Sequence, residues 1–325
     1  MTPPIPDQEH ADPTSPGERT SAGRAAGPSP RRLPLYLAIT LGWSVLIGAG
    51  LSIARIPVDS LVGIVLIAAL YMPSPLVAAL LVERGLVRPR LRLPLRTSRN
   101  IAVFVLAPVA AMIGWLLLYL AVVLVAGNLL GLPAFGAIAT SAADVIQAAS
   151  ALLGKAAVEA AGTPPPTAVL LIAGVWGAII AGWTINGLFA MGEEYGWRGL
   201  MWEELRHRGA VAANVLTGVA WGLWHAPLIL HGYNYPGFPL LGVLAMVALC
   251  IGMSFLLSGL RELTGSVLPV AAAHGMFNAV APLLMLLVLS PHPILTGVLG
   301  LLGAGLFLVP AAVVWRAVLR RPRTT

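Results

Sequence analysis

Long apolar runs separated by short polar turns fill the chain from residue 33 onward. About 20 mostly apolar residues are enough to cross the hydrocarbon core of a bilayer, and each run reaches that length. The pattern predicts an all-α integral membrane protein with about eight transmembrane helices. The predicted spans lie near residues 34–55, 60–83, 101–126, 168–192, 210–230, 239–260, 266–289 and 293–318.

Two segments lie outside this pattern. Residues 1–32 are rich in Pro, Gly, Ser and Thr with mixed charges, a composition that predicts a disordered cytoplasmic tail without a signal peptide. Residues 132–167 are Ala-rich, carry few charges and contain "TPPP", which we interpret as a surface helix followed by a linker. The remaining chain, 33–320, is expected to form one polytopic membrane domain.

Composition supports a lipid environment. Hydrophobic residues make up 58% of the chain, charged residues only 10%, and the mean hydropathy is +0.86. Soluble domains carry about 25% charged residues, so a soluble protein is excluded. The net charge of +7 comes from arginines in the turns between runs, which indicates membrane topology and not a nucleic-acid partner.

The basic residues alternate from turn to turn. They precede the first run, follow the last, and occupy every second connection in between, whereas the other connections hold only Arg55 and Lys155. Cytoplasmic loops carry such an excess of Lys and Arg. We therefore expect an even number of spans in the cell membrane, with both termini cytoplasmic.

Cysteine chemistry is limited to Cys250, the single cysteine of the chain. One cysteine excludes an internal disulfide and a cysteine-based metal cluster. We interpret Cys250 as a small apolar residue in a helix interface.

A few ionisable side chains fall at membrane depth, where each is costly unless it is paired or hydrated. Such groups are therefore candidates for function. After the second span they are Glu193, Glu194, Arg198, His225 and His274, with Asn278 as a polar neighbour.

Their depth follows from the turn near Gly209. Glu193 lies 16 residues before this turn and His225 lies 16 residues after it. Two antiparallel helices would hold both side chains at one depth, roughly 20 Å from the turn along a tilted helix. This requires the fourth helix to continue to about Arg206. With His274 about nine to ten residues into its own span, the three side chains are predicted to share a cavity open to the cytoplasmic side.

Local spacing predicts that the two adjacent glutamates point in different directions around the helix. Glu194 and Arg198 are four residues apart, in the order that favours a helical ion pair. Glu193 then points about 100° away around the helix and is available for another role. His274 and Asn278 are also four apart and share a face. The adjacent Glu203 and Glu204 fit a solvated helix end.

Two kinds of chemistry suit these groups. Glu193, His225 and His274 could bind a catalytic zinc with an open fourth position. Alternatively, Glu193 acts as general base on a water held by His225, while His274 and Asn278 stabilise an oxyanion. Both alternatives hydrolyse a peptide bond, and the cofactor is therefore either zinc or none.

Three short motifs carry a family resemblance. "EEYGWR" matches E-E-x-x-x-R, "WGLWH" resembles F-x-x-x-H with Trp221 in place of Phe, and "HGMFN" matches H-x-x-x-N. In this order and spacing, the sequence resembles the CAAX protease and bacteriocin-processing family of intramembrane endopeptidases. That family includes the type II CAAX prenyl proteases.

The resemblance implies a catalytic core at about 168–290. It implies that Glu193 is the catalytic carboxylate, supported by Glu194 and Arg198, and that His225 helps to hold the water. His274 and Asn278 would complete the site. The expected partners are the lipid bilayer and a membrane-associated protein or peptide substrate. The alternative function is a non-catalytic scaffold or bacteriocin self-immunity protein of the same family.

Overall fold

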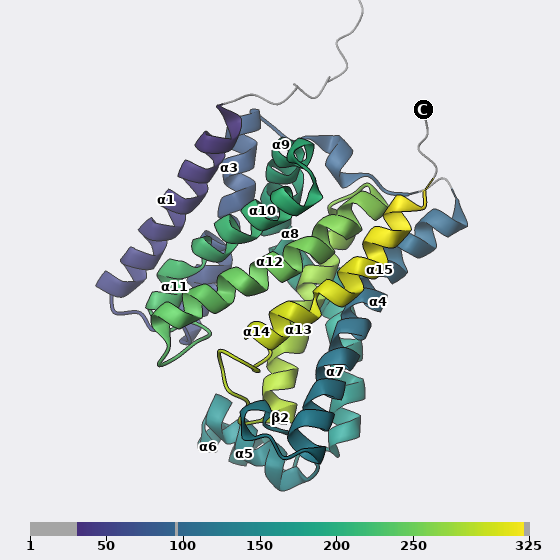
Figure 1. Ribbon diagram of the computed structural model, residues 1–325. Helices are drawn as coiled ribbons and strands as arrows, with labels where there is room; N and C mark the ends of the chain where they lie inside the picture. Colours follow the sequence, from purple (N-terminus) through teal and green to yellow (C-terminus); the bar gives the residue numbers. More distant parts are fainter. Residues whose placement is uncertain (1–30, 95–96, 322–325) are drawn as a thin grey trace, which may run out of the picture.

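The computed structural model describes residues 31–94 and 97–321. Figure 1 shows an assembly of long helices, in which the start of the first helix and the end of the last lie at the same end. The tail predicted at 1–32 falls almost entirely outside the described residues. The two β-strands have only two residues each, so the all-α class is confirmed.

Helices long and apolar enough to cross a membrane number seven in the described ranges, and an eighth crossing is a bent pair. The first half of the bundle contains α1 (Arg32–Ile53), α2 (Leu61–Leu66), π-helix η1 (Ile67–Tyr71), α3 (Ser74–Glu83), α4 (Ser98–Val122) and π-helix η3 (Val123–Leu129). The catalytic half predicted above contains α7 (Thr167–Trp183), α8 (Ile185–Glu194), π-helix η5 (Tyr195–Met201), α9 (Trp202–Leu205), α10 (Ala210–Trp224), α11 (Ala226–Leu230), α12 (Pro239–Thr264) and α13 (Leu268–Leu287). The chain then closes with α14 (Leu301–Leu306) and α15 (Leu308–Leu319).

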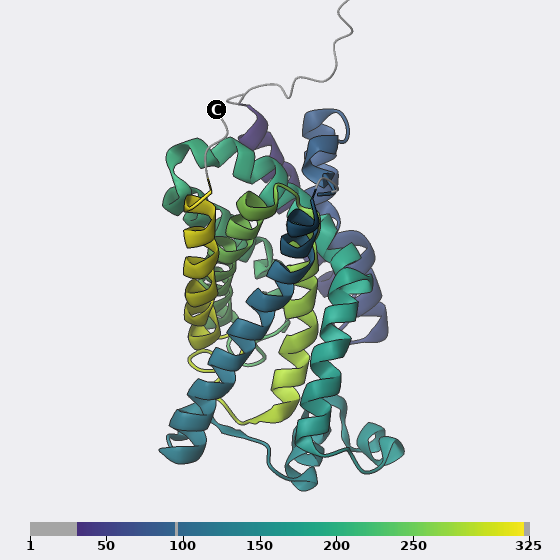
Figure 2. The ribbon, with the colours of Figure 1, turned by 90° about the vertical axis from the view of Figure 1, so that its right-hand side faces the viewer.

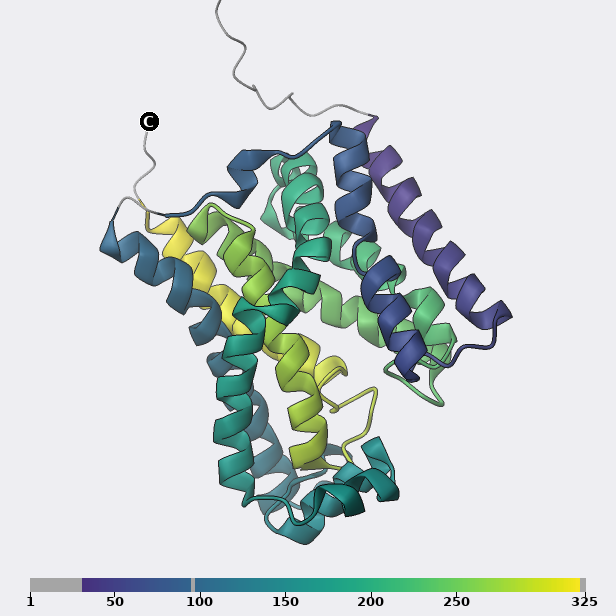
Figure 3. The ribbon, with the colours of Figure 1, turned by 180° about the vertical axis from the view of Figure 1, so that it is seen from behind.

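The bent pair is the fourth predicted span. Its halves, α7 and the helix Ile185–Arg208, meet at an angle of 52°. The bend lies at Thr184, where the helical dihedrals break, and Gly187 has no Cβ that would collide with the Gly182 carbonyl oxygen. The predicted continuation of this span past Glu193 is therefore confirmed. On either side of the bend, α7 and α8 both pack against α13 (Figure 3).

The last span differs from its prediction. Residues 290–300 form a loop, and the helical crossing comprises only α14 and α15. Pro291 and Pro293 cannot donate helical hydrogen bonds. The backbone N–H groups of Ile294 and Leu295 instead donate to His292 Nδ1, both at 3.3 Å.

The segment predicted as a surface helix and linker is more structured than expected. It contains a 3₁₀ turn η4 (Pro133–Phe135), strand β1 (Ala137–Ile138), α5 (Ala142–Leu153) and α6 (Lys155–Ala161). Strand β1 pairs antiparallel with β2 (Val288–Leu289). At the start of α5, Ser141 and Asp144 form a reciprocal capping box. Figure 2 shows this segment at the end of the bundle away from the C-terminus.

An ion-pair network joins the arginine-rich segments at the opposite end. Arg90, in the short 3₁₀ helix η2 (Arg88–Leu91) after α3, is buried and contacts Glu83 at 2.5 Å and Glu203 at 2.6 Å. Arg32 lies 3.6 Å from Glu204, which is 9% exposed. Glu203 and Glu204 are thus members of a partly buried network, and not a solvated helix end. Since these contacts join α1, α3 and α9, the arginine-rich segments lie at one end, as an even number of spans requires.

Arg90 remains charged within this network. Burial lowers the pKa of its guanidinium, but the hydrogen bonds to Glu203 and Glu83 outweigh that effect and raise the pKa above its ordinary value. The Arg90 carbonyl also accepts a hydrogen bond from Val267 N–H at 2.8 Å. Arg90 therefore connects α3, α9 and the residue that precedes α13.

We predict that Arg90→Ala destabilises the protein, because it leaves Glu83 and Glu203 without their buried partner. Breaking a buried pair in this way costs about 3–5 kcal/mol. Thermal unfolding in detergent would measure the loss, with the exposed Arg88→Ala as control, which should change stability by less than about 0.5 kcal/mol. Equal melting temperatures for the two variants would contradict the assigned role of Arg90.

Candidate active site

The two adjacent glutamates end α8, and the chain continues directly into the π-helix η5. Single π-helical turns occur often at functional sites because they widen the helix locally. Gly192 and Gly196 let the loop before α3 and the Tyr36 and Pro75 side chains pack closely behind the motif. The front of α8 is thereby left to face the interior of the bundle.

Glu194 is the centre of a fully buried charge cluster. Its Oε1 accepts hydrogen bonds from Arg198 Nη1 at 2.9 Å and contacts His274 Nδ1 at 2.8 Å. Arg198 Nη2 donates to Ser254 Oγ at 2.9 Å. Glu194 and Arg198 are both 0% exposed. The predicted Glu194–Arg198 pair therefore forms, and two further helices supply partners for it.

The close crossing of α8 and α13 brings His274 to this cluster. A Cβ on Gly275 would lie 2.6 Å from the backbone nitrogen of Gly187, so the two backbones touch at this point. Asn186 Nδ2 donates to the Gly275 carbonyl at 3.2 Å and joins the helices beside the glycine. The position of the His274 imidazole thus depends on Gly187, Gly275 and the side-chain amide of Asn186.

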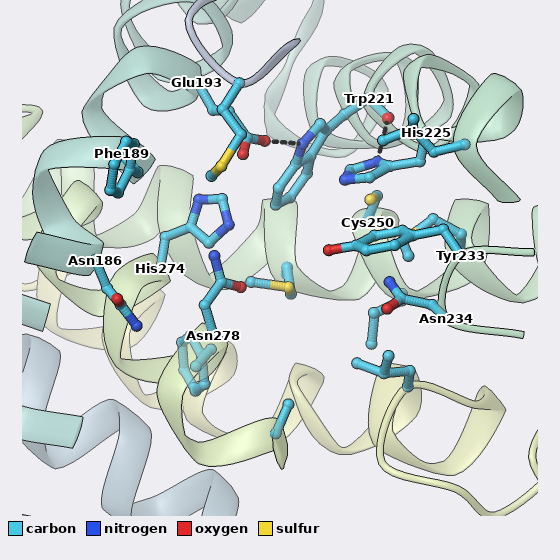
Figure 4. A pocket seen from close by; sticks show the side chains of 18 of the residues that line it. Asn186, Phe189, Glu193, Trp221, His225, Tyr233, Asn234, Cys250, His274 and Asn278 are labelled. Atoms are coloured by element: carbon cyan, nitrogen blue, oxygen red, sulfur yellow. Dashed lines mark hydrogen bonds between the residues drawn. The ribbon is translucent and has the colours of Figure 1, made fainter. Parts of the chain in front are cut away.

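Glu193 faces a different environment from Glu194. Its Oε2 accepts a hydrogen bond from the Trp221 indole N–H at 2.8 Å, and the side chain is only 3% exposed. In Figure 4 the Glu193 carboxylate lies above His274 at the edge of a cavity. The predicted division of the two glutamates, one paired and one facing the interior, agrees with this geometry.

Trp221 is the residue whose importance the sequence analysis missed. Besides holding Glu193, its ring lies under the Arg198 guanidinium, with 4.3 Å from Cζ to the ring centroid. Its ring centroid is 5.2 Å from that of His274 and 6.0 Å from that of His225. The available signal was the tryptophan in place of phenylalanine, because only an indole can donate a hydrogen bond here.

The remaining predicted residues line a cavity of about 490 Å³. Glu193, His225, His274 and Asn278 all line it, whereas Glu194 and Arg198 lie behind its wall. Asn278 lies next to His274, and His225 lies on the far side of Trp221 (Figure 4). His225 Nδ1 contacts the Trp221 carbonyl at 2.9 Å, which orients the ring.

The cavity extends in a direction that differs from the predicted cytoplasmic opening. Its loop residues, Tyr233, Asn234, Val298 and Leu299, come from connections at the end away from the arginine-rich turns. If the arginine-rich end is cytoplasmic, as the sequence predicts, the described cavity extends towards the outer side. The spacing on either side of Gly209 correctly placed Glu193 and His225 at one cavity, but it did not predict the end of the bundle towards which that cavity extends.

A zinc site does not assemble from these residues. Across the described ranges, no three His, Cys, Asp or Glu side chains are placed to hold one metal ion. The Trp221 indole lies between Glu193 and His225 (Figure 4). The trio of Glu193, His225 and His274 therefore does not fit a zinc ion in this arrangement.

Comparison with known families supports the motif analysis. Residues 169–280 match the family model for type II CAAX prenyl endopeptidase Rce1-like proteins. The match begins in α7, ends in α13 and includes all three motifs, and it confirms the resemblance drawn from them. No curated protein matches the chain. The chain is a multi-pass helical membrane protein, and its residues 169–280 are similar to the Rce1-like type II CAAX prenyl endopeptidases.

We predict that Gly275→Ala lowers stability, because the new methyl group would push α13 away from the α8 backbone. Overpacking of this kind costs about 1–3 kcal/mol. Thermal unfolding would measure the loss, and Gly305→Ala is the matched control because a Cβ there meets no atom within 4 Å. An unchanged melting temperature for Gly275→Ala would show that the close crossing is not required.

Proposed function

We propose that the protein is an intramembrane endopeptidase in which Glu193 activates water to hydrolyse a peptide bond. One observation carries this proposal: a buried carboxylate lies at a cavity edge, oriented by Trp221 at 2.8 Å, above an imidazole that Glu194 orients at 2.8 Å. A base and an adjacent polar group, each held by a second residue, are the arrangement that acid–base hydrolysis needs.

In the proposed reaction, Glu193 removes a proton from a water molecule, whose oxygen attacks the carbonyl carbon of the scissile bond. His274 and Asn278 stabilise the oxyanion by hydrogen bonding from the cavity wall. The tetrahedral intermediate collapses, the C–N bond breaks, and Glu193 returns the proton to the departing nitrogen. His225, which lines the same cavity on the other side of Trp221, contacts the substrate.

Charge balance supports a protonated His274 before the reaction. Glu193 and Glu194 bring two negative charges into the bundle, and Arg198 brings one positive charge. Burying an unbalanced charge costs several kcal/mol, so a proton on the imidazole favours the assembled site. Both imidazole nitrogens then donate, one to Glu194 and the other towards the cavity.

The proposed substrate is a membrane-associated protein or peptide. The cavity is lined mainly by aromatic and aliphatic side chains within helices that are long enough to span a bilayer. Such a lining suits a substrate segment that partitions into the membrane. Placement in the cell membrane, with both termini in the cytoplasm, completes the proposal.

We predict that Glu193→Ala and His225→Ala abolish cleavage of a membrane peptide library by purified protein. General acid–base catalysis contributes about 10²- to 10⁴-fold, so the Glu193 variant should lose at least about a hundredfold. Mass spectrometry of the products gives the rate, and the exposed carboxylate variant Glu159→Ala serves as control.

Two results would contradict this assignment. Full cleavage by Glu193→Ala would show that another group is the base. Loss of wild-type activity on chelation, restored by added zinc, would show that a metal site forms in spite of the separation by Trp221.

We predict that Trp221→Phe slows cleavage by about tenfold to a hundredfold, because it removes the N–H that orients Glu193 and keeps most of the ring. A hydrogen bond to a charged group is worth about 1.5–3 kcal/mol. The rate constant at saturating peptide measures the effect, and the melting temperature controls for packing. A rate equal to wild type would show that the indole N–H plays no part in positioning the base.

A further inference from the structure

A second cavity of about 440 Å³ adjoins the first. It lies between α5, the end of α13 and the loop that follows α13, and Gln147, Ala148 and Ala151 line it from α5. Four residues line both cavities: Asn234, Met285, Val298 and Leu299. The two cavities are therefore adjacent, with these shared residues at their junction.

The distance between the two cavities can be estimated along α13. His274 and Met285 are eleven residues apart on this helix, which corresponds to roughly 16 Å at 1.5 Å per residue. An extended polypeptide advances about 3.3 Å per residue. The shared residue Met285 thus lies about five residues of extended substrate away from the reacting bond.

The lining of the second cavity suits a polypeptide better than a lipid chain. Four consecutive residues, 288–291, line it. The side-chain amides of Gln147 and Asn234 add donors and acceptors, and neither is engaged by another described residue. Amide and backbone groups recognise the main chain of an extended peptide.

Asn234 and Ser290, which line the second cavity, have positive φ angles of 62° and 49° and mark turns of the chain there. The α5 wall also lies outside the segment 169–280 that matches the Rce1-like family model.

We propose that this second cavity is a substrate subsite, which binds extended polypeptide about five residues from the scissile bond. The subsite rests on the proposed peptidase function for its substrate. Such a subsite would give the protein a preference for peptides that continue beyond the cleavage site. The residues of α5 would contact that continuing part of the peptide.

The first test uses a nested series of fluorogenic peptides that contain one cleaved bond and grow by single residues on either side. For wild type, kcat/KM should rise about tenfold when one side reaches about five residues, an increase equivalent to about 1.4 kcal/mol. Ala148→Trp fills the cavity. In this variant, kcat/KM for the long peptides divided by kcat/KM for the short ones should be close to one. The control Ile146→Trp, on the opposite side of α5 and 37% exposed, should keep the tenfold ratio.

The second test needs no cleavage and stays informative if Ala148→Trp fails to fold. Cys250 is the only cysteine, so Cys250→Ala gives a thiol-free background. In that background, saturating twelve-residue peptides of mixed sequence should slow maleimide labelling of Ala148→Cys about tenfold. Labelling of Ile146→Cys should not change.

The outcomes separate the subsite from the peptidase function. Cleavage without any length preference, or an unchanged ratio in Ala148→Trp, would overturn the subsite and leave the peptidase proposal standing. Selective protection of Ala148→Cys without cleavage of any peptide would support the subsite and refute hydrolysis. Protection by lipid vesicles alone, with no added effect of peptide, would overturn the subsite in favour of an acyl chain.

Discussion

The buried charge of Glu194 constrains the rest of the catalytic half. This carboxylate is 0% exposed and lies at hydrogen-bond distance from both Arg198 and His274, and Arg198 in turn donates to Ser254. Leaving any of these charges unpaired would cost several kcal/mol. Because the partners come from η5, α12 and α13, the cluster fixes three helices relative to α8. The same requirement explains why two glycines allow α8 and α13 to touch.

This constraint produces the functional asymmetry of the two glutamates. Once Glu194 faces its partners, helical geometry turns Glu193 towards the cavity and the Trp221 indole. The two ends of the bundle are specialised as well. Arg90 and its carboxylate partners close the arginine-rich end, while the cavity extends towards the loops at the other end. A charge-paired wall thus lies behind Glu193, the carboxylate that we propose as the base, in a mostly apolar cavity.

Features set by local spacing could be predicted from the sequence, whereas features set by tertiary contacts could not. The spans, the Glu194–Arg198 pair and the shared cavity follow from hydropathy and helical periodicity. The bend at Thr184 contains no proline and depends on a glycine contact across the break. The sequence does not distinguish Arg90 from the other arginines between the predicted spans, because its partner Glu203 lies 113 residues away. The hydrogen bond that Trp221 donates could not be predicted, because it depends on Glu193 lying beside the indole in the folded protein.

The account is tested most directly by measuring activity and thermal stability together for Glu193→Gln and Glu194→Gln. It predicts that Glu193→Gln is inactive yet melts close to wild type, because the amide keeps a hydrogen bond to Trp221. Glu194→Gln should melt well below wild type, because Arg198 and His274 lose the charge that pairs them. The reverse pattern, with a stable but inactive Glu194→Gln and an active Glu193→Gln, would contradict the assigned division between the two glutamates.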